Sequence, residues 1–179
     1  PEVYRSLIFL GTIYNNQKNY VKAKTFLNNA ISRIREQGEL NNSWAGEAYA
    51  QLAVSSEGLK NNSAAADYYK EASRIYEAVY AGQYDDNYLS YLGNISLFYA
   101  NNDEPVLAIS AVNKGLNYVI KVQGKNSIST ALQLRNLAEV NFQLKKYKET
   151  ISAATEGLAV LDKVILQSSE VMDSIKIEM

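Results

Sequence analysis

Residues 10–14 read Leu-Gly-Thr-Ile-Tyr, and Tyr20-Val21-Lys22-Ala23 follows them; this stretch decides the fold because it recurs along the chain. Internal repeats are sought first, because a missed repeat misassigns the whole architecture. Shifts of 42, then 43, then 42 residues reproduce the pattern three more times. Three matched positions in every unit are small: Gly11, Ala23 and Ala30; Ala53, Ala65 and Ala72; Ser96, Ala108 and Gly115; Ala138, Thr150 and Gly157.

These twelve positions all hold Gly, Ala, Ser or Thr, although those types make up only 50 of the 179 residues. Small side chains at matched points of two helices let the backbones approach closely, where a leucine would overpack. The pattern therefore predicts that each unit is a pair of packed helices. The fold class it indicates is all-α, with four consecutive helical hairpins.

Polar breaks divide each unit into its two helices. In the first unit we expect helices over 3–16 and 20–37, separated by the segment Asn15–Asn19. Ser63 and Asp103 are candidate N-caps for later helices, and Pro105 fits the first turn of its helix, where a missing N–H is tolerated. The predicted repeats span 3–42, 43–85, 86–127 and 128–167 of a single array over 1–179.

The last residues, 168–179, extend the register, since Leu137 shifted by 42 reaches Met179. They would form either the start of a fifth repeat or a capping helix with Val171, Ile175 and Met179 on one face. Either arrangement would cover an apolar face that the end of a solenoid otherwise exposes. Because the first residue is Pro1 rather than Met, we interpret the sequence as a segment of a larger protein.

Composition excludes several classes of function. Cysteine and histidine are absent, which removes disulfides, thiolate nucleophiles, imidazole bases and almost every transition-metal site. A formal net charge of −1 gives no bulk attraction to nucleic acid or to anionic membranes. No run of 18 apolar residues and no leader sequence occur, which favours a cytoplasmic location. We expect no catalytic residues, no metal and no cofactor.

The pattern Leu-Gly-x-x-Tyr, then Ala-x-x-x-large, then a small residue, resembles the tetratricopeptide repeat. Leu10–Tyr14 with Tyr20–Ala23 matches it best, and Leu137-Ala138 with Tyr147–Thr150 comes next. The usual repeat has 34 residues, so the period found here is about eight longer. With Asn94 and Asn136 in their Leu-x-Asn contexts, the long period is similar to the kinesin light chain variety.

This resemblance implies a right-handed α-α superhelix of four hairpins plus a C-terminal helix, with the first helix of each hairpin lining a concave groove. The groove would bind a protein or a peptide, and another domain of the same chain is one candidate partner. By the family's offsets, the groove residues are Arg5, Ile8, Thr12 and Asn15; Glu47, Gln51, Val54 and Glu57; Ser90, Asn94, Leu97 and Asn101; and Arg135, Asn136, Glu139 and Gln143.

Three groove carboxamides, Gln51, Asn94 and Asn136, share one offset in successive units. Carboxamides both donate and accept hydrogen bonds, so a spaced row can pair with an extended peptide backbone. Alternatively, they solvate a helix face or cap a neighbouring turn. The carboxylate clamp of chaperone-binding relatives is absent in this register, because Ile8, Thr12, Ser90 and Asn94 stand where its side chains would be expected.

Other features have structural explanations. Asp85 and Asp86 fit a helix start, where acids favour the helix dipole, better than a catalytic pair. The fourteen tyrosines suit interhelical packing with the hydroxyl at the rim better than nucleobase stacking. Trp44 is expected to pack against the preceding helix rather than act as an exposed anchor.

Three classes of function follow from these features. The leading prediction is a protein–protein interaction scaffold that binds a segment in its groove. The alternative is a sensor or autoinhibitory arm of a larger signalling, protease or transcription-regulating protein. An enzyme is disfavoured, because neither His nor Cys nor a phosphate-binding glycine loop is present. The partner and the oligomeric state stay open at this stage.

Overall fold

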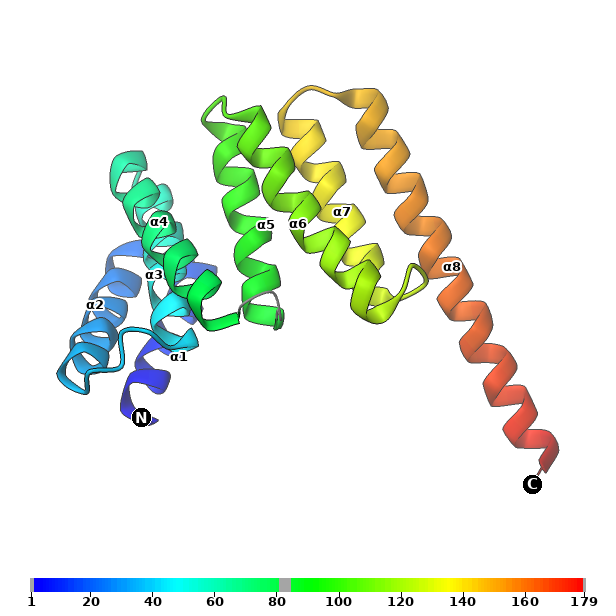
Figure 1. Cartoon of the computed structure of the whole chain (residues 1–179), viewed down its shortest axis with the longest axis horizontal. Helices are drawn as coiled ribbons and strands as arrows, with labels where there is room; N and C mark the ends of the chain where they lie inside the picture. The colour runs from blue at the N-terminus through cyan, green and yellow to red at the C-terminus, as the bar shows by residue number, and fades with distance from the viewer. Residues whose placement is uncertain (1, 81–84, 179) are drawn as a thin grey trace. The chain divides into compact units, whose positions relative to one another are not determined.

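The computed structural model of the chain describes residues 2–80 and 85–178, and the side chains of 3–80 and 85–167. Over these residues every regular element is a helix (Figure 1), so the predicted all-α fold of helical hairpins is confirmed. The helices are α1 (Glu2–Asn16), α2 (Tyr20–Glu36), α3 (Ser43–Gly58), α4 (Asn62–Tyr80), α5 (Asp86–Asn101), α6 (Pro105–Gln123), α7 (Ile128–Gln143) and α8 (Tyr147–Glu178).

The turn inside each hairpin has the same backbone geometry. Lys18, Lys60, Asp103 and Lys145 all have a positive φ between 59° and 61°, the left-handed conformation, and are spaced by 42, 43 and 42 residues. In every case the amide of the next residue donates back into the first helix, as Asn19 N does to Tyr14 O at 2.8 Å. This left-handed closure ends one helix and starts the next within three to four residues. The repeat is thus present in the backbone as well as in the side chains.

Side-chain caps start the helices, though not always at the predicted residue. Asn42 Oδ1 accepts from Ala45 N and Asp85 Oδ1 accepts from Tyr88 N, both at 2.9 Å. The prediction that Ser63 caps α4 is wrong, because Asn61 Oδ1 accepts a hydrogen bond from Ala64 N and Ser63 lies inside the first turn of α4. The cap position of α6 is Glu104 rather than Asp103, while Pro105 occupies the first turn as expected.

The chain divides into two compact units, residues 1–91 and 92–179. In the first unit α1, α2 and α3 enclose a core in which Ala23, Leu27, Ala30 and Ile34 are fully buried. The small residues act as predicted: a Cβ on Gly11 would lie 2.5 Å from Cγ of Leu27, so only glycine fits there.

The second unit has two smaller apolar clusters. Ala100 of α5, Ala108 and Val112 of α6 and Val140 of α7 form one cluster. Leu116 of α6 packs with residues of α7 and α8 in the other. Each cluster joins the second helix of one hairpin to the first helix of the next, which is the stacking that a solenoid requires.

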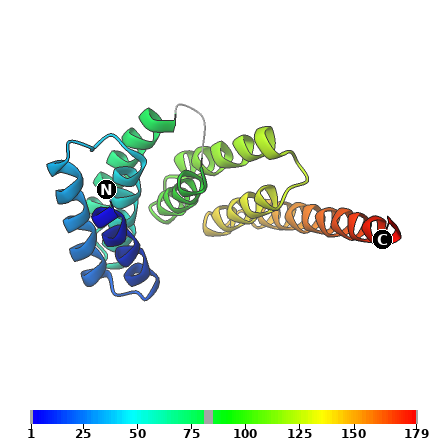
Figure 2. The ribbon, with the colours of Figure 1, turned by 90° about the horizontal axis from the view of Figure 1, so that it is seen from below.

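The end of the second unit differs from the prediction. Helix α8 runs without a break from Tyr147 to Glu178, so residues 168–178 continue the last helix instead of forming a separate capping or fifth-repeat helix. Figures 1 and 2 both show this helix projecting past the end of α7. Met179 lies outside the described residues. None of the described helices is both long and apolar enough to cross a bilayer.

Candidate peptide-binding surface

In the first unit, α1 and α3 lie side by side and carry the predicted groove positions. Arg5 is exposed, and its guanidinium carbon lies 4.9 Å from the centroid of the Trp44 ring. Trp44 is half-buried and packs against the core of this unit, as expected of a packing residue. Thr12 and Val54 are half-buried on the same two helices. The cation–π contact fixes a basic side chain at the start of this surface.

Ile8 does not line a groove. It is 2% exposed and belongs to the core of the first unit. The next residue, Phe9, is 67% exposed and lies 42 residues before Gln51, so Phe9 rather than Ile8 holds the matching register position. Strict application of the 42-residue shift would have identified Phe9. A large exposed aromatic side chain on this surface is a suitable contact for a partner.

Asn15 is also withdrawn from solvent, with 6% exposure. Its Nδ2 donates to both the backbone oxygen and Oε1 of Gln51, each at 2.9 Å, and its Oδ1 accepts from Ser55 Oγ at 2.7 Å. These bonds use both ends of the amide. Asn15 therefore ties α1 to α3 and is a packing residue rather than a free groove contact, which corrects the prediction.

Gln51 and Glu47 extend this network towards the open side of α3. Gln51 Nε2 donates to Glu47 Oε1 at 2.9 Å, and the hydroxyl of Tyr76 donates to Glu47 Oε2 at 3.0 Å. Two residues beyond Ser55, Glu57 Oε1 accepts a hydrogen bond of 2.5 Å from the hydroxyl of Tyr69. Two half-buried carboxylates thus stand on the predicted positions of α3, each held by a tyrosine of α4.

Burial raises the pKa of both carboxyl groups. For Glu47, the hydrogen bonds from Gln51 and Tyr76 oppose this shift of the pKa, and nearby Asp85 adds to it. For Glu57 only the hydrogen bond from Tyr69 opposes it. In the described part of the chain neither carboxylate has an ion-pair partner within 4.0 Å. A carboxylate that is desolvated without a cation favours the approach of one.

The remaining predicted positions vary in exposure. Ser90, in the first unit, is exposed. In the second unit Asn94 and Leu97 are half-buried, whereas Asn101, Glu139 and Gln143 are exposed. The exposed guanidinium of Arg135 donates to Asn136 Oδ1 at 3.3 Å.

The three carboxamides do not share one environment. Gln51 is bound into the Asn15–Glu47 network described above. Asn136 is half-buried, and its Nδ2 lies 3.2 Å from where a Cβ on Gly93 would stand, so it packs over the α5 backbone. Both amides therefore have packing roles, and a continuous peptide-reading row stays a prediction.

The tyrosines of the first unit fill space between helices, as the sequence indicated. Tyr69, Tyr76, Tyr88 and Tyr91 are at most 2% exposed and form a cluster of stacked and tilted rings between α4 and α5. Asp85 caps α5 and accepts a short hydrogen bond from the Tyr80 hydroxyl. Burial and this bond raise the pKa of Tyr80. These groups are structural.

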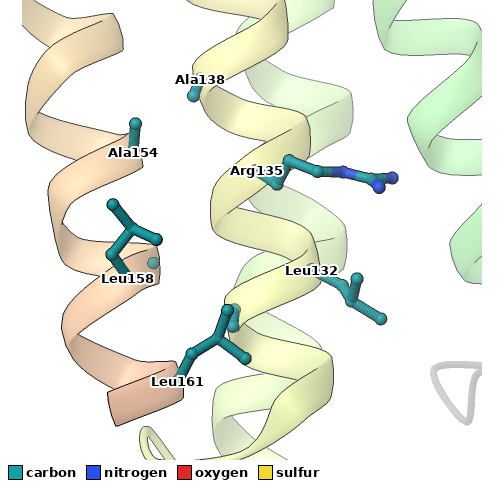
Figure 3. A pocket seen from close by; sticks show the side chains of 8 residues that line it. Leu132, Arg135, Ala138, Ala154, Leu158 and Leu161 are labelled. Atoms are coloured by element: carbon teal, nitrogen blue, oxygen red, sulfur yellow. The ribbon is translucent and has the colours of Figure 1, made fainter.

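The second unit carries an apolar pocket of about 340 Å³ (Figure 3), and of the predicted groove residues only Arg135 lines it. It lies between α7 and α8, with Leu158 and Leu161 on α8 and Leu132 and Arg135 on α7. Leu158 is 64% exposed and Leu132 is 47% exposed. The register could have identified Leu158, because its counterparts Ile31 and Leu116 are also apolar, but not Leu132, whose counterparts Arg5, Glu47 and Ser90 are polar.

Comparison with known proteins agrees with this architecture. The tetratricopeptide-repeat family profile matches residues 2–78, which span the first two hairpins. Over these two hairpins the chain is similar to the tetratricopeptide-repeat family. The predicted family resemblance is thereby confirmed.

Solved structures extend the likeness in fold. The crystal structure of BtubC (BKLC) from P. vanneervenii matches 89% of this chain at 15% identity with a TM-score of 0.74. This chain spans 63% of the length of that one. Two further structures are of kinesin light chain nearly identical TPR-like repeats from Podosopora anserina, one of them the Q17M form. Each matches 89% of this chain at 12% identity with a TM-score of 0.44. The matches cover 95% and 94% of those two chains. No curated protein matches the sequence. The tetratricopeptide-repeat fold is shared, and the long-repeat kinesin light chain variety stays a prediction.

Proposed function

We propose that this chain is a protein–protein interaction scaffold whose α1–α3 surface binds a peptide or protein segment carrying a basic side chain. Tetratricopeptide repeats mediate protein–protein interaction in general. Our proposal adds that the bound segment carries a basic side chain. The observation that carries the proposal is the pair of half-buried carboxylates, Glu47 and Glu57, which lack a cationic partner among the described residues. Phe9, exposed on the neighbouring helix α1, offers an apolar contact to the same segment.

The geometry favours a cation over a neutral donor. Glu47 already accepts hydrogen bonds from Gln51 and Tyr76. A further neutral donor would therefore add less than a cation, which compensates the negative charge of the carboxylate. A Lys or Arg side chain reaching α3 would provide it in a partly desolvated site, where an ion pair is worth more than at the open surface. Arg5, held over Trp44, would repel a second cation and so orient the segment.

Selection of peptides from a random library on the purified chain tests this proposal. We expect the selected sequences to be enriched in Lys and Arg. Binding of a selected peptide should weaken about tenfold when Glu47→Gln and Glu57→Gln are combined, as expected for the loss of a charged hydrogen-bonded pair. Glu36→Gln is the matched control, because Glu36 is an exposed carboxylate on α2.

Two results would contradict the proposal: selected peptides without basic residues, or equal affinity for the double variant and the control. Phe9→Ala tests whether the peptide contacts the α1 surface or is held by electrostatic attraction alone. This variant should weaken binding without changing the salt dependence of the affinity. The matching pair Asn94→Ala and Asn136→Ala tests whether the predicted groove continues on the second unit. That the array serves as the sensor arm of a larger protein stays a prediction.

A further inference from the structure

A second pocket of the second unit lies where α8 meets the loop that joins α6 to α7. It has a volume of about 250 Å³ and is lined by Ile120, Lys125, Asn126, Thr130, Glu156, Ala159, Val160 and Lys163. Figures 1 and 2 both show this loop running beside α8. Val160 and Ile120, which form its apolar part, pack with Leu116 of α6. The pocket therefore faces the preceding helix, α6, and shares no residue with the pocket between α7 and α8.

The repeat register relates this pocket to a site that is filled in the first unit. Three of its residues have counterparts there at successive shifts of 42 and 43 residues: Asn126 matches Asn41, Glu156 matches Glu71, and Ala159 matches Arg74. The asparagine and the glutamate are thus present in both units. The arginine of the first unit is replaced by a small residue in the second.

Arg74 shows what the asparagine and the glutamate can hold together. Its Nη2 donates to Glu71 Oε1 at 2.7 Å, and its Nε donates to the same carboxylate at 3.2 Å. Nη1 and Nη2 both donate to Asn41 Oδ1 at 3.4 Å. The hydrogen bond from Arg74 lowers the pKa of Glu71. Although α5 follows this hairpin, the Arg74 side chain stays 52% exposed, so a following helix leaves this site open.

In the second unit the same two acceptors lack such a partner. Ala159 ends at its Cβ, and the pocket lies beside it. Among the described residues no cation lies within 4.0 Å of the Glu156 carboxylate, and the side-chain amide of Asn126 has no hydrogen-bond partner. Lys125 and Lys163 also line the pocket, but both are exposed, and a lysine can turn its ammonium group to solvent on its flexible stem.

We propose that this pocket binds the guanidinium group of an arginine side chain that a partner protein supplies. The partner's arginine takes the place that Arg74 holds in the first unit, with Glu156 and Asn126 Oδ1 as its acceptors. Arginine is favoured over lysine, because the acceptors belong to two side chains and a planar fork of five N–H donors reaches both at once. The site lies on the second unit and does not depend on the α1–α3 surface proposed above.

NMR titration of the ¹⁵N-labelled chain with N-acetyl-arginine methylamide, an arginine with both ends blocked, tests this proposal. We expect saturable shifts of the Asn126 side-chain amide and of the backbone amides of Glu156 and Ala159. Glu156→Gln should weaken binding of this probe about fivefold, as expected for the loss of an exposed ion pair. Glu149→Gln is the matched control, because Glu149 is an exposed carboxylate of the same helix and does not line the pocket.

Two further variants exchange the filled and the open site between the units. Ala159→Arg should fill the pocket from within the chain by pairing with Glu156, and should abolish binding of the probe. Arg74→Ala should open the corresponding site of the first unit, so that the probe also shifts the signals of Asn41 and Glu71. Circular dichroism and thermal unfolding verify that both variants are folded.

Several outcomes would overturn the proposal. Shifts that are absent at these residues, or equal affinity for Glu156→Gln and its control, would show that the pocket does not hold a guanidinium. Equal binding of N-acetyl-lysine methylamide would show that the site selects charge and not the guanidinium fork. Preference for N-acetyl-glutamate methylamide would assign the pocket to an acidic partner through Lys125 and Lys163. Tighter binding of free L-arginine than of the blocked probe would make it a site for a small molecule.

Discussion

The α2 face in the first unit and the α8 face in the second unit hold the same repeat positions in opposite environments. Ile34 is fully buried under α3, while its counterpart Leu161 lines an open pocket. Both are apolar, and both lie on the second helix of a hairpin. The difference comes from the neighbour, since α3 follows the first hairpin and no described helix covers the last one. Register determines which residues can pack, and the next element determines whether they do.

The largest test of this comparison removes matched side chains from both faces. Ile34→Ala should lower the free energy of unfolding of the first unit by about 2–5 kcal/mol, because it leaves a cavity in a close-packed core. Leu161→Ala should lower that of the second unit by about 1 kcal/mol or less, because the site is already open to water. Urea unfolding at concentrations where the chain is monomeric measures both. Equal effects would mean that the α8 face is covered in solution.

Replacing one glycine in each unit provides a second test, because the two substitutions should change the free energy of unfolding in opposite directions. Gly11→Ala should destabilise the first unit by about 1–3 kcal/mol, since the new methyl group would lie 2.5 Å from Leu27 Cγ in a filled core. A Cβ on Gly157 in α8 would meet its nearest atom at 3.4 Å, an ordinary contact. Gly157→Ala should therefore stabilise the second unit by up to about 1 kcal/mol through helix propensity. Thermal unfolding of both variants checks the signs, and destabilisation by Gly157→Ala would show tighter packing there.

The pH dependence of stability distinguishes the two units further. Glu47 on α3 has a raised pKa in the folded chain because it is buried. Its protonation therefore stabilises the fold below the unfolded-state pKa, and this contribution is lost as the pH rises through the folded-state pKa. At the matching position the second unit has Leu132, which does not titrate.

Glu47→Gln should accordingly raise the free energy of unfolding at neutral pH and flatten its dependence on pH in the acidic range. The glutamine keeps an acceptor for the Tyr76 hydroxyl. Denaturant unfolding at a series of pH values measures this, with the exposed Glu36→Gln as control. An unchanged pH profile would show that Glu47 is well solvated in the folded state.

Much of the fold could be predicted because it is encoded locally. The 42-to-43-residue period and its small residues gave the hairpins, and the left-handed turns repeat at the same spacing. Ile8 was misplaced by one position, since an apolar helix residue next to Phe9 fits either face when only the helix is considered. The Asn15–Ser55 bond could not be predicted, because it joins residues 40 apart through side-chain geometry. The continuous α8 was missed because a periodic pattern does not say where a helix turns back.

The smallest expected effect concerns the turns, where the two units should behave alike. Lys60 in the first unit and Asp103 in the second adopt the same left-handed conformation, which strains a side chain with a Cβ but not glycine. Lys60→Gly and Asp103→Gly should each stabilise by about 0.5 kcal/mol, the relieved strain being partly offset by the greater freedom of glycine in the unfolded chain. Thermal unfolding measures both, with the exposed helical Lys70→Gly as a destabilising control. A gain in only one unit would mean that contacts with neighbouring helices, rather than the turn itself, set the local energy. Equal gains in stability would show that the energy of each turn is set within its own hairpin and not by the packing of neighbouring hairpins.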